Sequence, residues 1–335
     1  MVPTLEPTAD LLAYIGRAAG PPRHSPAPVD EGAIRAWCNA LGDSLPSYRD
    51  STRGIVAPPT MLQAWTMHDR RQAPEPEVTD FAEAELLAKL TAWGCTAVVA
   101  TNCEQSYVRP LRPGDLVTSQ TTIADIVGPK RTALGEGYFV TLQTDYFDEA
   151  GEQVGTMRFC SLRYRAEKRR SEKPVPRPAE ISPNPTAVVG RTIGPVTTVT
   201  RRFDEVSVGD ELPPLEIYVT PTLIISGAIA SRDFNVLHHD RDRAVAAGAA
   251  DIFMNILTTN GLVGRFVTEW AGPGATLRRV AIRLGAPNYP YDTLRLSSLV
   301  GACEPRAVGG SVTLELRGAN SLGDHVTGSV ELELP

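Results

Sequence analysis

An order of elements that occurs twice constrains the fold of this chain more than any other feature. Alternating apolar and polar residues, the pattern of half-buried strands, form two sets of four segments. The first set spans 97–108, 116–126, 137–147 and 154–164, and the second spans 279–284, 293–300, 311–318 and 325–334. Helical sequence precedes each set. Each half is therefore predicted to contain helices followed by an antiparallel sheet, which is an α+β fold.

Short matches between the halves occur in the same order and indicate an internal duplication. Segment 113–115 (PGD) corresponds to 290–292 (PYD), each at the start of a long predicted strand. The most informative match joins 42–48 (GDSLPSY) to 232–238 (RDFNVLH). In both segments an Asp is followed five residues later by a ring-bearing polar residue.

The length of the chain and a proline-rich, charged segment within it agree with two domains. The 335 residues suit about two domains of ordinary size. A run beginning at Ala166, AEKRRSEKPVPRPAEISPNP, mixes charge with proline, which does not enter a packed helix or sheet. We therefore predict an N-terminal domain over 1–165, a linker over 166–195 and a C-terminal domain over 196–335.

Composition excludes several protein classes. The formal net charge of −6 and the absence of a basic run argue against a nucleic-acid binder. No stretch approaches the roughly 20 apolar residues of a membrane span, and the start lacks the pattern of a secretory signal. The cysteines are odd in number and widely spaced, which suits buried thiols in a reducing compartment; they are Cys38, Cys95, Cys103, Cys160 and Cys303. These features predict a cytoplasmic protein.

The two halves differ in their central helix. Segment 256–271 has apolar residues at helical spacing and ends at Gly272, so it predicts one long buried helix. In the first half, the corresponding helix over 61–71 runs into prolines near position 75 and is predicted to restart with Thr79 as its N-cap. A sheet whose covering helix is broken can leave space for a bulky ligand.

Polar side chains gather at the end of one predicted helix. An apolar stretch over 223–230, in a predicted helix whose first position is Pro221, is followed by Asp233, Asn235 and His238. Three polar groups beside a buried segment cost stability unless they form a network. From spacing alone, a polar helix cap is an equally good interpretation. The remaining histidines that we considered are predicted to lie at surfaces or turns; they are His24, His68 and His325.

The pattern D-x-N-x-x-H, followed by A-V-A-A-G, resembles the signature of the MaoC-like, R-specific enoyl-CoA hydratase family. This resemblance implies the hotdog fold, in which a sheet wraps a central helix. The whole chain is then a double hotdog with two antiparallel sheets, and its N-terminal central helix is broken. The resemblance also implies that Asp233 and His238 are catalytic and that Asn235 supports them.

Two departures from the family pattern affect the expected site. Val236 stands where a proline often follows the Asn, which concerns the stiffness of the loop. The family usually has His-Gly at the start of the central helix, where a backbone N–H forms an oxyanion hole, and here these positions are Met254 and Asn255. Because Asn tolerates positive φ, the backbone of these two residues is still expected to supply the donor.

Longer stretches resemble one branch of this family. Segments ASRDFNVLHHDRDRAV, DIFMNILTTNGLV and GDHVTG resemble the catalytic subunit of the actinobacterial steroid side-chain hydratases of cholesterol degradation. Segments APPTMLQAWTM and GYFVTLQTDYF resemble the MaoC-like part of the partner subunit. The resemblance implies a fusion of both subunits, in which the first half forms a wall of the acyl pocket. In that half Leu45 and Tyr48 replace the Asn and His, and a tyrosine is a poor base at neutral pH.

The implied reaction is hydration of an α,β-unsaturated steroid acyl-CoA, with a 17(20)-enoyl-CoA as the expected substrate, to the β-hydroxyacyl-CoA. A carboxylate and an imidazole that touch one water can remove one proton and deliver another on the same face. We favour His238 as base and Asp233 as acid, a choice that the sequence leaves open. No metal or redox cofactor is implied, because neither the acid–base pair nor the oxyanion donor needs one. Coenzyme A is part of the substrate.

Cationic side chains are expected near the phosphates of coenzyme A. The candidates at predicted strand ends are Lys130, Arg131, Arg278 and Arg279, with solvated surface charge as the alternative for each. Candidate protein partners are a second copy of the chain and an aldolase or thiolase-like pathway enzyme. Alternative functions are hydration of fatty enoyl-CoA thioesters, a non-catalytic acyl-CoA-binding scaffold, and thioester hydrolysis on the same fold.

Overall fold

The computed structural model describes residues 9–335 with the exception of 51, 53, 68–80 and 167–197. The predicted linker over 166–195 lies, apart from Ala166, outside the described residues. So do His68 and the prolines that were expected to break the first central helix.

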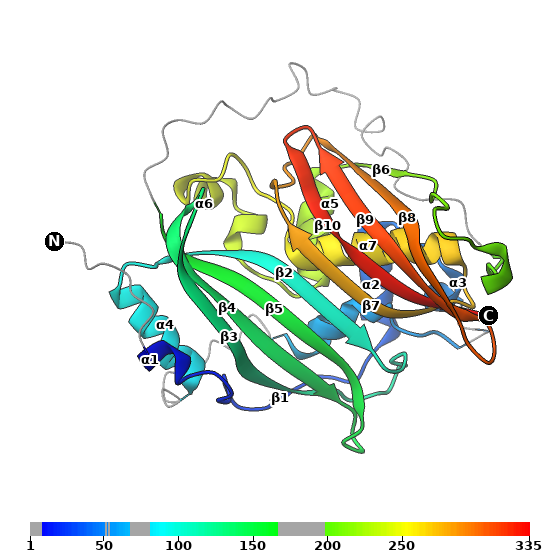
Figure 1. Cartoon of the computed structure of the whole chain (residues 1–335), viewed down its shortest axis with the longest axis horizontal. Coiled ribbons are helices and arrows are strands. Elements are labelled where there is room, and N and C mark those ends of the chain that lie inside the picture. The colour runs from blue at the N-terminus through cyan, green and yellow to red at the C-terminus, as the bar shows by residue number, and fades with distance from the viewer. Residues whose placement is uncertain (1–8, 51, 53, 68–80, 167–197) are drawn as a thin grey trace.

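The described strands form one antiparallel sheet (Figure 1). Those of the first half are β1 (Arg23–His24), β2 (Ala97–Tyr107), β3 (Thr118–Thr132), β4 (Gly135–Phe147) and β5 (Gln153–Ala166). Those of the second half are β6 (Leu215–Tyr218), β7 (Thr276–Leu284), β8 (Thr293–Pro305), β9 (Gly310–Asn320) and β10 (Gly323–Leu334). Their order is β1-β3-β4-β5-β2-β7-β10-β9-β8-β6. The two predicted sheets therefore join edge to edge, through the antiparallel pair β2 and β7.

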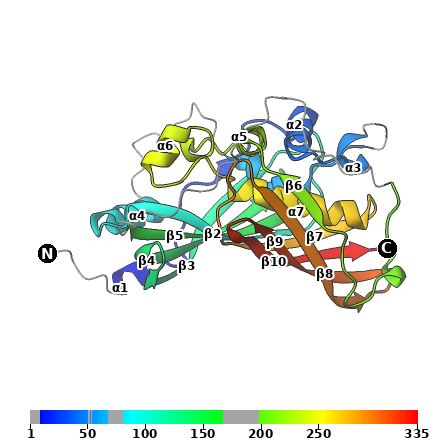
Figure 2. The same cartoon turned by 90° about the horizontal axis from the view of Figure 1, so that it is seen from above.

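The described helices are α1 (Ala9–Leu12), α2 (Glu31–Leu41), α3 (Pro46–Arg49), α4 (Ala82–Ala92), α5 (Pro221–Ala230), α6 (Arg241–Ala246) and α7 (Ile256–Ala271), with short 3-10 turns η2 (Pro59–Thr66), η3 (Phe203–Glu205) and η4 (Val236–His238). Helices α2, α3, α5, α6 and α7 lie on one side of the sheet (Figure 2). Helix α7 lies next to the sheet, and α2 and α5 pack on each other above it. None of these described helices is long and apolar enough to cross a membrane.

The central helix of the second half forms as predicted. Helix α7 begins after Asn255, whose side chain accepts a hydrogen bond from the Thr258 amide, and it ends at Gly272 with φ of 89°. Leu262, Val263 and other apolar side chains along it are fully buried. An end-to-end buried helix of this kind is stabilised mainly by the apolar area it removes from water.

In the described part of the first half, the short 3-10 turn η2 stands where the central helix was predicted, and it contacts α7. Pro58 precedes this turn and Pro59 is its first residue, and both prolines restrict its backbone. The next described helix, α4, has Phe81 as its N-cap residue and no side-chain cap. The predicted cap at Thr79 is therefore wrong, and Thr79 itself lies outside the described residues.

The internal duplication extends to the backbone at the ends of α2 and α5. Each helix is followed by a residue with left-handed backbone, Gly42 with φ of 69° and Arg232 with φ of 58°. The next amide then donates to the carbonyl five positions earlier, at 2.8 Å for Asp43 and 2.9 Å for Asp233. These matched bonds place both aspartates identically on their helices.

The turns that follow are matched as well. The amide two positions after each Asp donates to its carboxylate, at 3.0 Å for Leu45 and 3.2 Å for Asn235. The amides of Tyr48 and His238 then donate to the carbonyl three positions earlier, at 3.0 Å and 3.1 Å. The same local fold therefore presents a Leu and a Tyr in one half and an Asn and a His in the other.

Close packing of α7 against α2 depends on Gly261. A Cβ atom there would lie 2.7 Å from Cζ2 of Trp37 and closer still to Cδ1 of Leu41. We expect Gly261→Ala to lower the free energy of unfolding by about 1–3 kcal/mol through overpacking, although Ala is the better helix former. Urea unfolding measures this. Gly20→Ala is the control, because no heavy atom lies within 4 Å of its Cβ, and equal stability of both variants would contradict the packing account.

Candidate active site

The turn after α5 brings Asp233 and His238 together, as predicted. Nε2 of His238 lies 3.5 Å from Oδ2 of Asp233. The imidazole is buried, with 8% of its side chain exposed, while 23% of the Asp233 side chain is exposed. The pair is thus reached from solvent on the carboxylate side only.

A hydrogen bond of the second ring nitrogen fixes the orientation of the His238 imidazole. Nδ1 of His238 lies 2.7 Å from the carbonyl oxygen of Phe253, which can only accept, so Nδ1 carries a proton. The ring also packs edge-on against the Phe253 ring, with centroids 5.1 Å apart. Nε2 of the neutral ring is then an acceptor that faces a carboxylate oxygen.

Asn255 holds the carboxylate in place. Its Nδ2 donates to Oδ2 of Asp233 at 2.9 Å and to Oγ of Ser231 at 3.0 Å. Its Oδ1 accepts from the Thr258 amide at 2.8 Å, which caps α7. The sequence pattern indicated only a backbone role for Asn255. Its side chain could have been found from the preference for Asn before the first turn of a helix.

Two expectations for the oxyanion hole need correction. The backbone N–H of Met254 donates to the carbonyl of Asn288 at 3.0 Å, so it is already bonded and the predicted role of Met254 is wrong. Asn255 has φ of −77°, and the positive φ considered for it does not occur. The backbone N–H of Asn255, at the start of α7, stays a candidate donor.

Asn235 contacts Asp233 through its backbone, and the hydrogen bond of its side chain is to the Leu237 amide, so its supporting role stays a prediction. Its Oδ1 accepts from the Leu237 amide at 3.1 Å and caps η4, and the residue is exposed. The backbone N–H of Asn235 is the group of this residue that donates to the carboxylate of Asp233.

The predicted CoA-binding cations are divided between two regions. Lys130 and Arg131 are exposed at one end of β3. Arg279 on β7 donates to Glu104 and Glu331. Arg278, also on β7, lies near the first-half turn that carries Tyr48 and not at the dyad. The structure does not gather the four cations at one place, and their role in binding coenzyme A stays a prediction.

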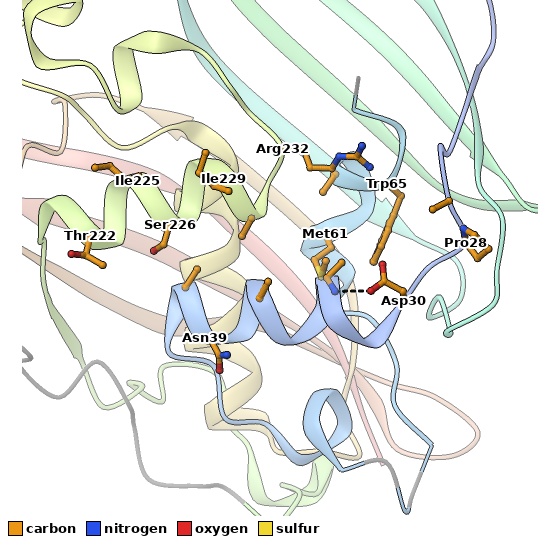
Figure 3. Close-up of a pocket in the computed structure, with 16 residues that line it drawn as sticks. Pro28, Asp30, Asn39, Met61, Trp65, Thr222, Ile225, Ser226, Ile229 and Arg232 are labelled. Carbon is orange, nitrogen blue, oxygen red and sulfur yellow. Dashed lines mark hydrogen bonds between the residues drawn. The ribbon is translucent and has the colours of Figure 1, made fainter. Parts of the chain in front are cut away.

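A largely apolar cavity of about 720 Å³ lies between α2, η2 and α5, beside the loop that carries the dyad (Figure 3). The first half contributes Met61 and Trp65, and the second contributes Ile225, Ile229 and Arg232. Arg232 precedes Asp233 directly in the sequence, while Asp233 and His238 themselves are not among the residues that line the cavity. Both halves form its wall.

One histidine was assigned to the wrong environment. His325 on β10 is only 1% exposed, whereas it was predicted to lie at a turn. Its Nδ1 donates to the Ala286 carbonyl at 2.8 Å, and its Nε2 accepts from the Thr259 hydroxyl at 2.9 Å. Burial lowers the pKa of His325. His24 is exposed on β1, as predicted.

Comparison with known proteins relates both the sequence and the fold to hydratases. A model of the FAS1-like dehydratase domain region matches residues 13–157. The chain is 52% identical over 127 residues to the beta subunit of the 3-oxo-4,17-pregnadiene-20-carboxyl-CoA hydratase of Mycobacterium tuberculosis, covering 38% of this chain and 95% of that subunit. It is 38% identical over 158 residues to the alpha subunit from the same organism, covering 44% of this chain and 50% of that subunit.

A probable enoyl-CoA hydratase alpha subunit of Thermomonospora curvata is 39% identical over 182 residues, covering 52% of this chain and 56% of that protein. The chain thus spans about half the length of the two alpha subunits that it matches.

Solved structures confirm the predicted double hotdog. A MaoC-like dehydratase superposes with a TM-score of 0.72 at 20% identity, over 97% of this chain and 100% of that one. A Mycobacterium tuberculosis protein described as having a double hotdog fold superposes with a TM-score of 0.61 at 16% identity, over 94% and 96% of the two chains. At these identities the likeness concerns the fold alone.

The buried His325 makes stability depend on pH. Because its pKa is lowered in the folded chain, the unfolded chain binds the proton more readily, and the free energy of unfolding falls as pH drops below about 6.5. His325→Gln keeps a side-chain amide near Thr259 but removes the titration. We expect the stability difference between the native chain and this variant to shrink from pH 7.5 to pH 5.5 in urea unfolding. A difference that stays constant over this range would contradict the assignment.

Proposed function

This chain belongs to the MaoC-like hydratase family, and we propose that it adds water to an α,β-unsaturated steroid acyl-CoA thioester to give the β-hydroxyacyl-CoA. The observation that carries the proposal is the Asp233–His238 pair, 3.5 Å apart and held by Asn255. The steroid substrate is supported by the M. tuberculosis relatives, whose name gives a 3-oxo-4,17-pregnadiene-20-carboxyl-CoA as their substrate. A 17(20)-enoyl-CoA fits that name.

In the proposed reaction the pair holds one proton in total. Nε2 of His238 takes a proton from a water molecule, and the resulting hydroxide attacks Cβ of the enoyl thioester. Protonated Asp233 gives its proton to Cα. A proton then passes from His238 to Asp233 across the short gap between them and restores the starting state. General acid and base catalysis of this kind is typically worth about 10²–10⁴-fold each.

The negative charge that develops on the thioester oxygen needs a fixed donor. In our proposal the backbone N–H of Asn255 supplies it, at the positive end of the 16-residue helix α7. The acyl body occupies the cavity between α2, η2 and α5, because its volume and apolar lining suit a polycyclic group. This chemistry requires no metal or redox group. Association with a second copy or with an aldolase or thiolase-like enzyme stays a prediction.

The direct test is incubation of the purified chain with 3-oxo-4,17-pregnadiene-20-carboxyl-CoA, followed by mass spectrometry. We expect the product to gain the mass of one water. Release of free coenzyme A would instead indicate a thioesterase, faster turnover of straight-chain enoyl-CoA would favour a fatty-acyl hydratase, and no turnover would favour a scaffold.

Asp233→Asn and His238→Gln should each lower kcat by about 10²–10⁴-fold. The matched control is His239→Gln, which changes the exposed neighbouring histidine and should leave kcat unchanged.

Asn255 is a positioning residue in this proposal, and Asn255→Asp separates its two tasks. The variant keeps an oxygen to cap α7 but replaces the donor that faces Asp233 with an acceptor. We expect kcat to fall at least tenfold and the pH profile of kcat to move upward, because two carboxylates side by side disfavour loss of the proton that they share. Thermal unfolding serves as the check on the cap. A lower kcat with an unmoved pH profile would contradict the positioning role.

A further inference from the structure

A second cavity lies at the turn of the first half that corresponds to the catalytic turn. Its volume is about 280 Å³. The lining comes from the turn after α2, the segment before η2, the end of β2 and the start of β7. It includes Leu45, Tyr48, Arg109, Ala275, Leu277 and Arg278.

This cavity lies at the first-half turn whose backbone matches that of the turn carrying Asp233 and His238. Leu45 and Tyr48 line it, and the matched backbone hydrogen bonds place them where Asn235 and His238 stand in the second half. The duplication has therefore kept the turn, and in the first half a cavity lies beside it.

The groups around this space cannot perform the hydration chemistry. Tyr48 is buried, and burial raises the pKa of its hydroxyl well above the ordinary value. The carboxylate of Asp43 is buried, accepts from the Leu45 amide, and does not line the cavity. A ligand here would be bound and not hydrated.

Two guanidinium groups stand at the cavity. Nε and Nη2 of Arg278 contact Glu333, and its Nη1 donates to the Val108 carbonyl. Arg109 is held by Asp115 and Asp148. These partners fix each side chain in position, while roughly a third of each remains exposed. A guanidinium has five N–H donors, so each keeps hydrogen bonds to offer to phosphate or amide oxygens.

We propose that this cavity is a second, non-catalytic binding site for coenzyme A and its thioesters. The pantetheine arm enters between Leu45 and Leu277, and the phosphates meet Arg109 and Arg278. The volume is less than half that of the cavity beside Arg232, which suits a slim arm better than a polycyclic acyl body. The choice of ligand rests on the proposed function, because the second half is proposed to bind the same thioester.

The test is the stoichiometry of free coenzyme A binding to the whole chain, measured by isothermal titration. We expect two sites per chain. Ala275→Trp places a large ring in the second cavity and should reduce the count to one while leaving kcat unchanged. Ala84→Trp, on an exposed face of α4, is the matched control and should keep two sites. Arg278→Gln leaves the cavity open and should weaken one of the two sites by about tenfold or more.

The outcomes separate this proposal from the proposed function. A single site in the native chain, no binding, or two undiminished sites in Ala275→Trp would each overturn it, whatever the turnover. A chain that binds two molecules, loses one in Ala275→Trp and hydrates no enoyl thioester would contradict the proposed function alone. Circular dichroism confirms that Ala275→Trp is folded, and Arg278→Gln gives an independent reading if it is not.

Discussion

The geometry of the candidate active site depends on two hydrogen bonds of the Asn255 side chain. One end of its amide caps α7 and the other end holds the carboxylate of Asp233. Helix α7 is buried along almost its whole length and contacts both α2 and η2 of the other half. The position of the dyad is thereby tied to the packing between the two halves and not to a flexible loop alone. A shift of α7 would move the carboxylate relative to the imidazole, which is held separately by the Phe253 carbonyl.

Duplication explains how one chain divides its tasks. The same helix end and turn occur twice, with left-handed backbone at Gly42 and Arg232. Only the second copy carries an imidazole opposite an accessible carboxylate. The first copy has a buried tyrosine and contributes Met61 and Trp65 to the cavity beside the dyad. Under the proposed function, the half without the imidazole contributes to binding and the other half carries the chemistry.

Features set by local sequence could be predicted, and features set by distant contacts could not. The bounds of α7, the start of α5 at Pro221 and the meeting of Asp233 with His238 follow from apolar spacing, helix termini and a short motif. The burial of His325 depends on β10 packing over α7, and the bond of Met254 depends on Asn288. Neither partner is close in sequence. The joining of two sheets through β2 and β7 likewise depends on pairing between halves.

The central claim is that one carboxylate and one imidazole, on a single turn, deliver both parts of a water molecule to the same face of the double bond. Hydration in D₂O, with the relative configuration of the product determined by NMR, measures this directly. The account predicts one deuterium at Cα on the same face as the new hydroxyl. Addition to opposite faces, or deuterium distributed over both faces of Cα, would contradict it.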